Sequence, residues 1–530
     1  MSIEKDDHII EVGEIQQNAS LKSISSGNHN IDEKFKNEDH NSDHDDEYSE
    51  ADIALRLAEA SHNIQITPEQ DRALYRKLNI YVTPLICLIY AIQYMDKVTI
   101  SYTAIMGLRT DLDLKGQEFS WLGTGFYLGY LVAELPGVRI LQRFPLVKAL
   151  SVYVFLWGLC LTLNSLAFNF KSILIARIAL GVLESTISPA SQMITSQYFK
   201  KEEQIQTIGA WFSSNGLGNI LGGVISYALA RHQKSISIDS WKVLFIITGL
   251  LTIVLSFILY FHLGDTPADA WFLTEEEKFI ALERIRANNQ GYGNRKFKKY
   301  QVYEALRDVR LYVFILHGLI SCIPNGGLGS FGSILINSSF KFSALESLLI
   351  GLPAGAVQIA SAIILFVSIH FFGHRTLVGI ATYSVGTIGG FLLAFGKSRG
   401  IQLAGYYLVN FNGIGWVTML GLMNGGTKGS TKIAFFQGAY FVAYCVGNTI
   451  GPQTFRSKDA PNYAPAKITV AACNVISISL VLLLYLINNW ENKRRDKEQE
   501  KLGDEYWNAP KNYEFLDLTD FENKNFRYNL

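Results

Sequence analysis

The chain has 530 residues, of which 49% are hydrophobic and 18% are charged, with no net charge and a positive mean hydropathy. A soluble protein of this length would carry about 25% charged residues, so the composition favours a polytopic membrane protein with polar ends. The balanced charge gives no support for a nucleic-acid-binding protein.

The first element of the chain is a polar and acidic N-terminal segment. Positions 1–50 contain 14 acidic and 4 basic residues. A segment of this composition cannot bury enough apolar surface to fold, and it does not resemble a signal peptide. We therefore predict that residues 1–65 form a disordered acidic cytosolic tail.

Twelve apolar runs of about 20 residues follow, and each is long enough to cross a bilayer as a helix. A polar segment at 263–310 separates the first six from the last six. We predict an all-α polytopic membrane protein with the major facilitator fold, 12 transmembrane helices in two six-helix halves at 66–262 and 311–489, and a cytosolic C-terminal tail at 490–530. In this layout the substrate site lies between the halves near the membrane midplane. The runs lie near 80–104, 118–139, 147–167, 171–197, 205–230, 241–262, 311–336, 344–369, 374–396, 400–423, 431–452 and 466–489.

Basic residues indicate the orientation of these spans. They precede the first span and follow the second, fourth and twelfth, which all fall on one side of the membrane when the number of spans is even. Because cytosolic loops carry an excess of Lys and Arg, we expect both termini to be cytosolic. The residues are Arg72, Arg76, Lys77, Arg139, Arg143, Lys148, Lys200, Lys201, Lys493, Arg494 and Arg495.

The central polar segment at 263–310 has its own helical signals. Thr274 and Glu277 have the spacing of a capping box, and apolar residues then recur every three positions in "EEEKFIALERIR". A second helical stretch, "YEALRDVR", leads into the seventh span. We predict a cytosolic helical linker between the two halves.

Four ionisable residues lie inside apolar spans, at a cost of roughly 2.5–3.5 kcal/mol each on insertion scales. Asp96 and Lys97 are adjacent in span 1, and Arg177 and Glu184 are seven residues apart on one face of span 4. The helical rise places Asp96 and Arg177 at similar depth, so neighbouring spans 1 and 4 would form one buried charge cluster. The acids could carry a proton, and the bases could attract an anion. The alternative is a set of static salt bridges that joins the two spans.

Other polar residues inside the spans are weaker signals. They could line a substrate cavity, although each alone could equally form a hydrogen bond between helices. Glu134 lies near the cytosolic end of span 2, where we expect it to pair with a loop arginine. We expect the small-residue pairs Gly218 and Gly222, and Gly447 and Gly451, to allow close helix contact. The candidate cavity residues are Tyr94, Tyr127, Tyr130, Asn215, Asn325, Asn412 and Gln437.

Several stretches resemble one known group of transporters. They are "YMDKVTISYTAI", "VAELPGVRILQRFPLVK", "RIALGVLESTISPASQM", "DTPADAWFLTEEEKFIALERIR", "VGNTIGPQTFRSKDAPNY" and "DLTDFENKNFRY". From about residue 66 to its end, the chain is similar to the fungal allantoate permease-like branch of the anion:cation symporter family, within the major facilitator superfamily.

The resemblance implies an activity and roles for the charged residues. Members of the family carry small organic anions inward with protons, for example allantoate, nicotinate, pantothenate, biotin and short peptides. Related organic-anion symporters have an acid followed by a base in span 1, and an arginine and a glutamate seven apart in span 4. The resemblance therefore implies that Asp96 and Glu184 carry protons and that Lys97 binds the substrate carboxylate.

We predict from this reading a proton-coupled symporter that imports a small organic anion by alternating access. Candidate substrates are allantoate, a vitamin carboxylate or a small peptide, and the other partners are protons and the lipid bilayer. The alternative is a non-transporting nutrient receptor on the same fold. We expect a monomer in the plasma membrane, with an intracellular membrane as the alternative location. The cysteine spacing and the lack of catalytic motifs predict no metal, no cofactor and no enzyme activity.

Overall fold

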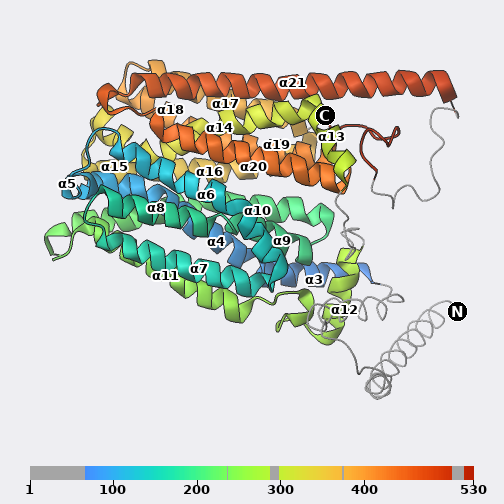
Figure 1. Ribbon diagram of the computed structural model, residues 1–530, viewed down its shortest axis with the longest axis horizontal. Coiled ribbons are helices and arrows are strands. Elements are labelled where there is room, and N and C mark those ends of the chain that lie inside the picture. The colour runs from blue at the N-terminus through green and yellow to red at the C-terminus, as the bar shows by residue number, and fades with distance from the viewer. Residues whose placement is uncertain (1–65, 236, 287–297, 373–374, 504–517) are drawn as a thin grey trace, which may run out of the picture. The chain divides into compact units, whose positions relative to one another are not determined.

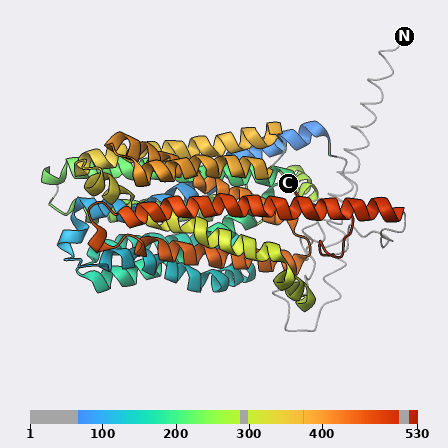
Figure 2. The ribbon, with the colours of Figure 1, turned by 90° about the horizontal axis from the view of Figure 1, so that it is seen from above.

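The computed structural model describes residues 66–235, 237–286, 298–372, 375–503 and 518–530, and within these ranges the chain forms helices and no strand. The predicted disordered tail at 1–65 lies outside the described residues, as does the middle of the predicted linker. The long helices run side by side, and α21 extends beyond them at the end where α12 and α13 lie (Figures 1 and 2).

The helices of the first half follow the predicted spans with small shifts at their ends. In the first span, the α-helix α4 gives way to a short π-helix, η2. The fourth span is divided into two helices, α8 and α9. The helices are α3 (Pro68–Tyr81), α4 (Thr83–Thr103), η2 (Ala104–Leu108), α5 (Arg109–Asp111), α6 (Glu118–Arg143), α7 (Leu146–Leu163), η3 (Asn164–Leu166), α8 (Phe170–Glu184), α9 (Ile187–Tyr198), α10 (Lys201–Arg231), η4 (Gln233–Ser235) and α11 (Ser240–His262).

The second half repeats these irregularities in corresponding places. A π-helix, η6, follows α14 as η2 follows α4, and the tenth span is divided into α18 and α19 as the fourth is divided. The remaining helices are η5 (Pro267–Asp269), α12 (Glu275–Arg286), α13 (Lys299–Arg307), α14 (Val309–Ile334), η6 (Leu335–Ser339), α15 (Ala344–Ile350), α16 (Leu352–Phe372), α17 (Arg375–Phe395), α18 (Arg399–Val409), α19 (Asn412–Gly426), α20 (Ser430–Gln453), η7 (Ser457–Asp459) and α21 (Ala464–Leu502).

Among the described residues, nine helical segments are long and apolar enough to cross a membrane. Three further predicted spans correspond to α6, α10 and α18 with α19, which are also helical. These three contain polar residues such as Glu134, Asn215 and Asn410, which lower their average hydropathy. The number of twelve spans stays a prediction.

The two predicted small-residue pairs are confirmed as sites of close helix contact. Gly218 of α10 faces the backbone of Ala91 in α4, and Gly447 of α20 faces the backbone of Leu319 in α14. A methyl group added at either glycine would overlap the facing carbonyl oxygen. These glycines therefore allow the backbones of α4 and α10, and of α14 and α20, to touch.

The linker contains the predicted helix, α12, and the capping box at its start is confirmed. The backbone N–H of Thr274 donates to Glu277 Oε2 at 2.9 Å, and the Glu277 N–H donates to Thr274 Oγ1 at 3.3 Å. Glu277 also accepts from Lys77 Nζ at 2.6 Å, and Arg284 pairs with Asp71 at 2.6 Å. These ion pairs attach α12 to the first half.

The C-terminal residues pack on the second half. We call residues 518–530 the C-terminal clasp, because Asp520 is completely buried and pairs with Arg310 of α14 at 2.5 Å and Lys432 of α20 at 2.9 Å. Lys432 also pairs with Glu304 of α13 at 2.8 Å. Burial alone would raise the pKa of Asp520, but Arg310 and Lys432 lower this pKa to about 2. The predicted boundary at 489 falls inside α21, which continues to Leu502.

Several of the hydrogen bonds that join the two halves lie at one end of the helices. The Ser333 N–H donates to Ser101 Oγ at 2.9 Å, and Thr124 Oγ1 donates to the carbonyl oxygen of Thr449 at 2.9 Å. Ser120 Oγ donates to the carbonyl oxygen of Phe455 at 3.3 Å. By position along their helices, these contacts lie at the end opposite α12, α13 and the clasp.

Candidate functional site

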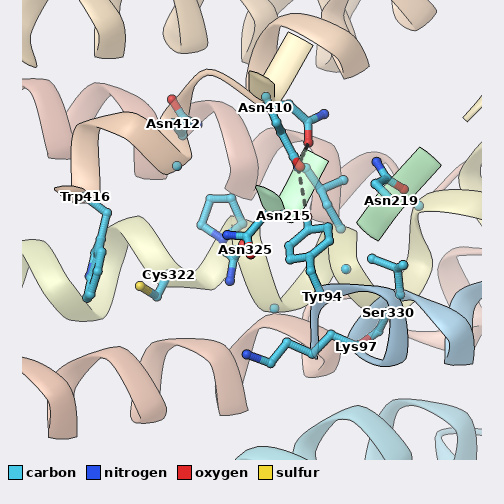
Figure 3. Close-up of a pocket in the computed structure, with 18 of the residues that line it drawn as sticks. Tyr94, Lys97, Asn215, Asn219, Cys322, Asn325, Ser330, Asn410, Asn412 and Trp416 are labelled. Atoms are coloured by element: carbon cyan, nitrogen blue, oxygen red, sulfur yellow. Dashed lines mark hydrogen bonds between the residues drawn. The ribbon is translucent and has the colours of Figure 1, made fainter. Parts of the chain in front are cut away.

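A cavity of about 190 Å³ lies between the two halves, and α4, α6 and α8 to α10 face α14, α16 and α18 to α20 across it. Two of the helix interruptions border it. The turn between α8 and α9 follows Glu184, and the turn between α18 and α19 contains Asn410, which lines the cavity. Figure 3 shows Lys97 on one wall and the amides Asn325, Asn410 and Asn412 among the residues around the space.

The first half contributes the positive charge of the cavity wall. Lys97 is partly exposed, and its Nζ lies 5.7 Å from the centre of the Tyr130 ring. No carboxylate of a described residue lies within ion-pair distance of Lys97. Arg177 also lines the cavity, and its guanidinium lies 5.2 Å from the centre of the Phe126 ring. The site therefore presents cations beside aromatic faces.

The two acids lie behind this wall. Asp96 is completely buried, accepts a hydrogen bond from Trp157 Nε1 at 2.9 Å and lies 3.6 Å from Arg177 Nη1. Glu184 is also completely buried, and neither of its carboxylate oxygens has a hydrogen-bond partner among the described residues. Asp96, Lys97 and Arg177 are close enough to interact electrostatically with Glu184. The predicted cluster of four charged residues is therefore formed, and we call it the midspan cluster.

The second half lines the cavity with neutral amides and aromatic rings. Gln358 Nε2 donates to Tyr94 Oη and to Asn410 Oδ1, both at 2.9 Å, and so joins the two halves (Figure 3). Asn325 Nδ2 donates to Asn448 Oδ1 at 2.8 Å, and Asn412 Nδ2 donates to Asn474 Oδ1 at 2.8 Å. The predicted amides at 325 and 412 thus line the cavity and also form hydrogen bonds between helices.

The remaining candidates divide into those inside and those outside the cavity. Tyr127, Tyr130 and Asn215 line it, as predicted. Gln437 does not line it, and its Nε2 instead donates to Asn424 Oδ1 at 3.0 Å. A single polar residue on a helix can face either the cavity or a neighbouring helix. The sequence alone therefore could not show which of these Gln437 faces.

Glu134 differs most from its predicted position. We expected it to pair with a loop arginine, but it is 6% exposed, and Cys445 Sγ of α20 donates to its Oε2 at 3.5 Å. The prediction placed the side chain by its distance from the end of the helix. The sequence does not show that α20 of the other half packs against the Glu134 side chain.

Sequence reasoning missed several residues of the site. Trp157 looks like a core residue, and only its indole N–H distinguishes it from other apolar residues of α7. Gln358 and Asn410 are polar residues inside apolar runs, which is the signal that identified Asn325 and Asn412. Trp416 lines the cavity and stacks against Tyr440 with ring centres 5.6 Å apart.

Comparison with known proteins agrees with this architecture. A profile of the Major Facilitator Superfamily matches residues 86–452. The chain is 40% identical to the allantoate permease of Saccharomyces cerevisiae, over 90% of each chain. It is 42% identical to an uncharacterized transporter of Schizosaccharomyces pombe, over 88% of this chain and 91% of that protein. It is 35% identical to the thiamine pathway transporter of Saccharomyces cerevisiae, over 91% of each.

Solved structures show the same fold at low sequence identity. The xylose transporter of Escherichia coli, in a partially occluded inward-open conformation, superposes with a TM-score of 0.58 at 16% identity, over 76% of this chain and 97% of that one. An inward-facing bacterial homologue of the human lysosomal transporter Spinster gives a TM-score of 0.57 at 16% identity, over 76% and 96%. The chain therefore belongs to the Major Facilitator Superfamily, among its fungal allantoate permease-like transporters.

Proposed function

We propose that this transporter is a proton-coupled symporter that imports a small organic anion by alternating access. The observation that carries the proposal is Lys97, a cation on the cavity wall that forms no ion pair with a described residue. A lysine at this depth is costly unless an anion neutralises it. A carboxylate beside Lys97 would do so, and Arg177 would add to the attraction.

The two buried acids support proton coupling. Asp96 competes with a bound anion for the positive charge of Arg177 and Lys97, because an ionised Asp96 already neutralises part of it. Protonation of Asp96 frees that charge for the substrate, so proton binding and anion binding would strengthen each other. Glu184 lies within electrostatic reach of both cations and would act in the same way.

The contacts between the halves support an orientation. They close the end of the bundle opposite the linker and the clasp. With both termini in the cytosol, as the basic loop residues indicate, this end faces outward and the conformation faces inward. We place the transporter in the plasma membrane, where an importer of nutrients would act.

The cavity and the named relative limit the substrate. A volume of about 190 Å³ suits a small molecule. The amides of Asn325, Gln358 and Asn410 could bind polar groups away from the carboxylate. Allantoate, nicotinate, pantothenate and short peptides have this combination of a carboxylate and a further polar group, and we propose them as the substrates to test, with a monomer as the transporting unit.

Uptake assays test this function directly. Cells that lack the gene and cells that express it would be supplied with a panel of labelled carboxylates at external pH 5 and pH 7. We expect one or more of the anions to accumulate, and to accumulate more at pH 5. Saturable binding to the purified protein without uptake would instead indicate a receptor. Transport of neutral sugars but of no anion would contradict the assignment.

A further inference from the structure

Glu134 is a buried acid that belongs neither to the cavity wall nor to the midspan cluster. It lies nine residues before α6 ends at Arg143, which places it about 14 Å inside that end of the helix. An ionisable residue at this depth costs roughly 3 kcal/mol on insertion scales. Such a residue is expected to have a partner or a function.

The partner of Glu134 comes from the other half of the protein. Cys445 Sγ of α20 donates to Glu134 Oε2 at 3.5 Å, and a thiol is a weak donor. The same two helices meet where Thr124 bonds to the Thr449 carbonyl oxygen and where the rings of Tyr127 and Tyr444 lie 6.4 Å apart. Glu134 therefore lies on the surface along which the two halves are closed.

No cation of the described residues pairs with Glu134. Arg177 pairs instead with Asp96, and the Lys97 ammonium faces the ring of Tyr130. An ionised carboxylate with one weak donor and no cation is unfavourable in a buried site, whereas a protonated carboxyl is tolerated. The titratable groups that interact with Glu134 are Tyr130 of α6 and Cys445 of α20. Cys445 in turn interacts with Cys322 of α14 and Lys97 of α4. On α8, which packs against α6, Glu184 interacts with Asp96, Lys97 and Arg177.

We propose that Glu134 is a proton-dependent contact between the two halves. When it is protonated, α6 and α20 can stay together as observed. When it is ionised, burial of the charge between α6 and α20 is unfavourable, because the single thiol hydrogen bond does not offset the loss of hydration, and the halves part at the end where they are now joined. The proposal rests on the proposed function for its place in transport, because a proton taken up from outside would favour closure and its loss to the cytosol would reset the empty carrier.

The test follows the opening of the halves without using a substrate. Ser120 is buried at the closed end and does not line the cavity, and Ser120→Cys keeps a donor toward the Phe455 carbonyl oxygen. The full-length Ser120→Cys protein would be purified in detergent and labelled with a maleimide from pH 5.5 to pH 7.5. Peptide-resolved mass spectrometry would report labelling at position 120 while the native cysteines remain. Labelling of an exposed Asn525→Cys variant corrects for the pH dependence of the reagent.

We expect corrected labelling of Ser120→Cys to be about tenfold slower at pH 5.5 than at pH 7.5, a typical coupling between two sites. Adding Glu134→Gln, which resembles the protonated acid, should keep labelling slow at every pH. Adding Glu134→Asp should retain the pH dependence and shows that the site tolerates substitution. Glu118→Gln removes an acid from the start of the same helix and should behave as the parent protein.

Two results would overturn the proposal: labelling that does not change with pH in the parent, or an unchanged pH dependence after Glu134→Gln in a protein that remains monodisperse. Neither result depends on anion transport. A protein that shows the expected labelling but accumulates no carboxylate would refute the proposed function and leave the role of Glu134 intact.

Discussion

Two groups of buried charged residues in the described part of the chain differ in how completely they are paired. In the midspan cluster, Arg177 pairs with Asp96, but Asp96, Arg177 and Glu184 all retain buried polar atoms that have no hydrogen-bond partner among the described residues. The second group, which we call the end cluster, lies where the clasp meets the second half. Each of its members forms an ion pair or a hydrogen bond. The end cluster comprises Glu304, Asp308, Arg310, Lys432 and Asp520.

The difference separates a functional group of charges from a structural one. Breaking a well-paired buried ion cluster costs stability, because a charge then remains without its partner. An incompletely paired cluster already bears such a cost in the resting protein. Proteins keep unpartnered buried charges mainly where a ligand or a proton uses them. On this basis we assign transport to the midspan cluster and anchoring to the end cluster.

The largest effect is expected for Asp96→Asn. The substitution removes an acid whose proton affinity is linked to anion binding, while the amide can still accept from Trp157 Nε1. We expect it to abolish accumulation of substrate driven by a pH gradient. Uptake with and without a gradient measures this effect, and a gradient dependence equal to that of the parent would exclude Asp96 as a proton carrier.

Glu184→Gln should separate two modes of transport. The amide resembles the protonated acid, so the substrate should still bind and exchange. The return of the empty, deprotonated carrier would fail, so net uptake should be lost while counterflow of pre-loaded substrate persists. Both are measured in reconstituted vesicles. Normal net uptake in the variant would favour the static salt-bridge interpretation of the midspan cluster.

Lys97→Ala should weaken anion binding by about 10- to 100-fold, because a hydrogen bond to a charged group contributes about 1.5–3 kcal/mol. Lys97→Arg keeps the charge and should stay within a few-fold of the parent. Substrate binding to purified protein compares the three. Equal affinities would show that Lys97 is only a counter-ion of the buried acids.

In the end cluster, Asp520→Asn should lower stability rather than change the coupling to protons. It leaves Arg310 and Lys432 without one of their buried partners, at a cost of about 3 kcal/mol. Asp496→Asn is the matched control, because it breaks an exposed ion pair with Arg527 of the same clasp, which is worth at most about 1 kcal/mol. Thermal unfolding in detergent and uptake at two pH values distinguish stability from coupling. Equal unfolding temperatures for the two variants would contradict the anchoring role.

The smallest expected effect is the change in docking of the C-terminal clasp with pH. The pKa of Asp520 falls from its usual 3.8 to about 2, so docking of the clasp is stabilised above pH 4 and loses this contribution only as the pH falls toward 2. Hydrogen exchange of residues 518–530 should therefore be constant between pH 5 and pH 8 after correction for the intrinsic exchange rate. A clasp that opens within this range would show that the end cluster is also a switch.

The sequence predicted those features that depend on local pattern. Apolar runs indicated the helices, the spacing of Thr274 and Glu277 indicated the capping box, and the helical rise brought Asp96 and Arg177 to one depth. Each of these follows from residues close together in one element. The family resemblance then connected the charged residues with transport.

The missing features depend on contacts between distant parts of the chain. Asp520 and Arg310 are 210 residues apart, and nothing in either segment indicates that they meet. We predicted that Glu134 pairs with a loop arginine, because the sequence does not show which residues of α20 face α6. The same is true of Gln437. Polar residues lie on several faces of α20, so the hydrophobic periodicity of this helix does not indicate which face lines the cavity.

The contact between α10 and α16 has a mechanical consequence. Gly216 and Gly355 bring the backbones of the two halves together, and a methyl group on either would overlap the other's carbonyl oxygen. Gly216 is the middle residue of α10, so both ends of this helix lie about 22 Å from the contact. If one half rotates as a rigid body relative to the other about this contact, a rotation of about 15° displaces each end of α10 by about 6 Å. A small angular change could thus open one side to a small molecule while closing the other, with no helix needing to bend.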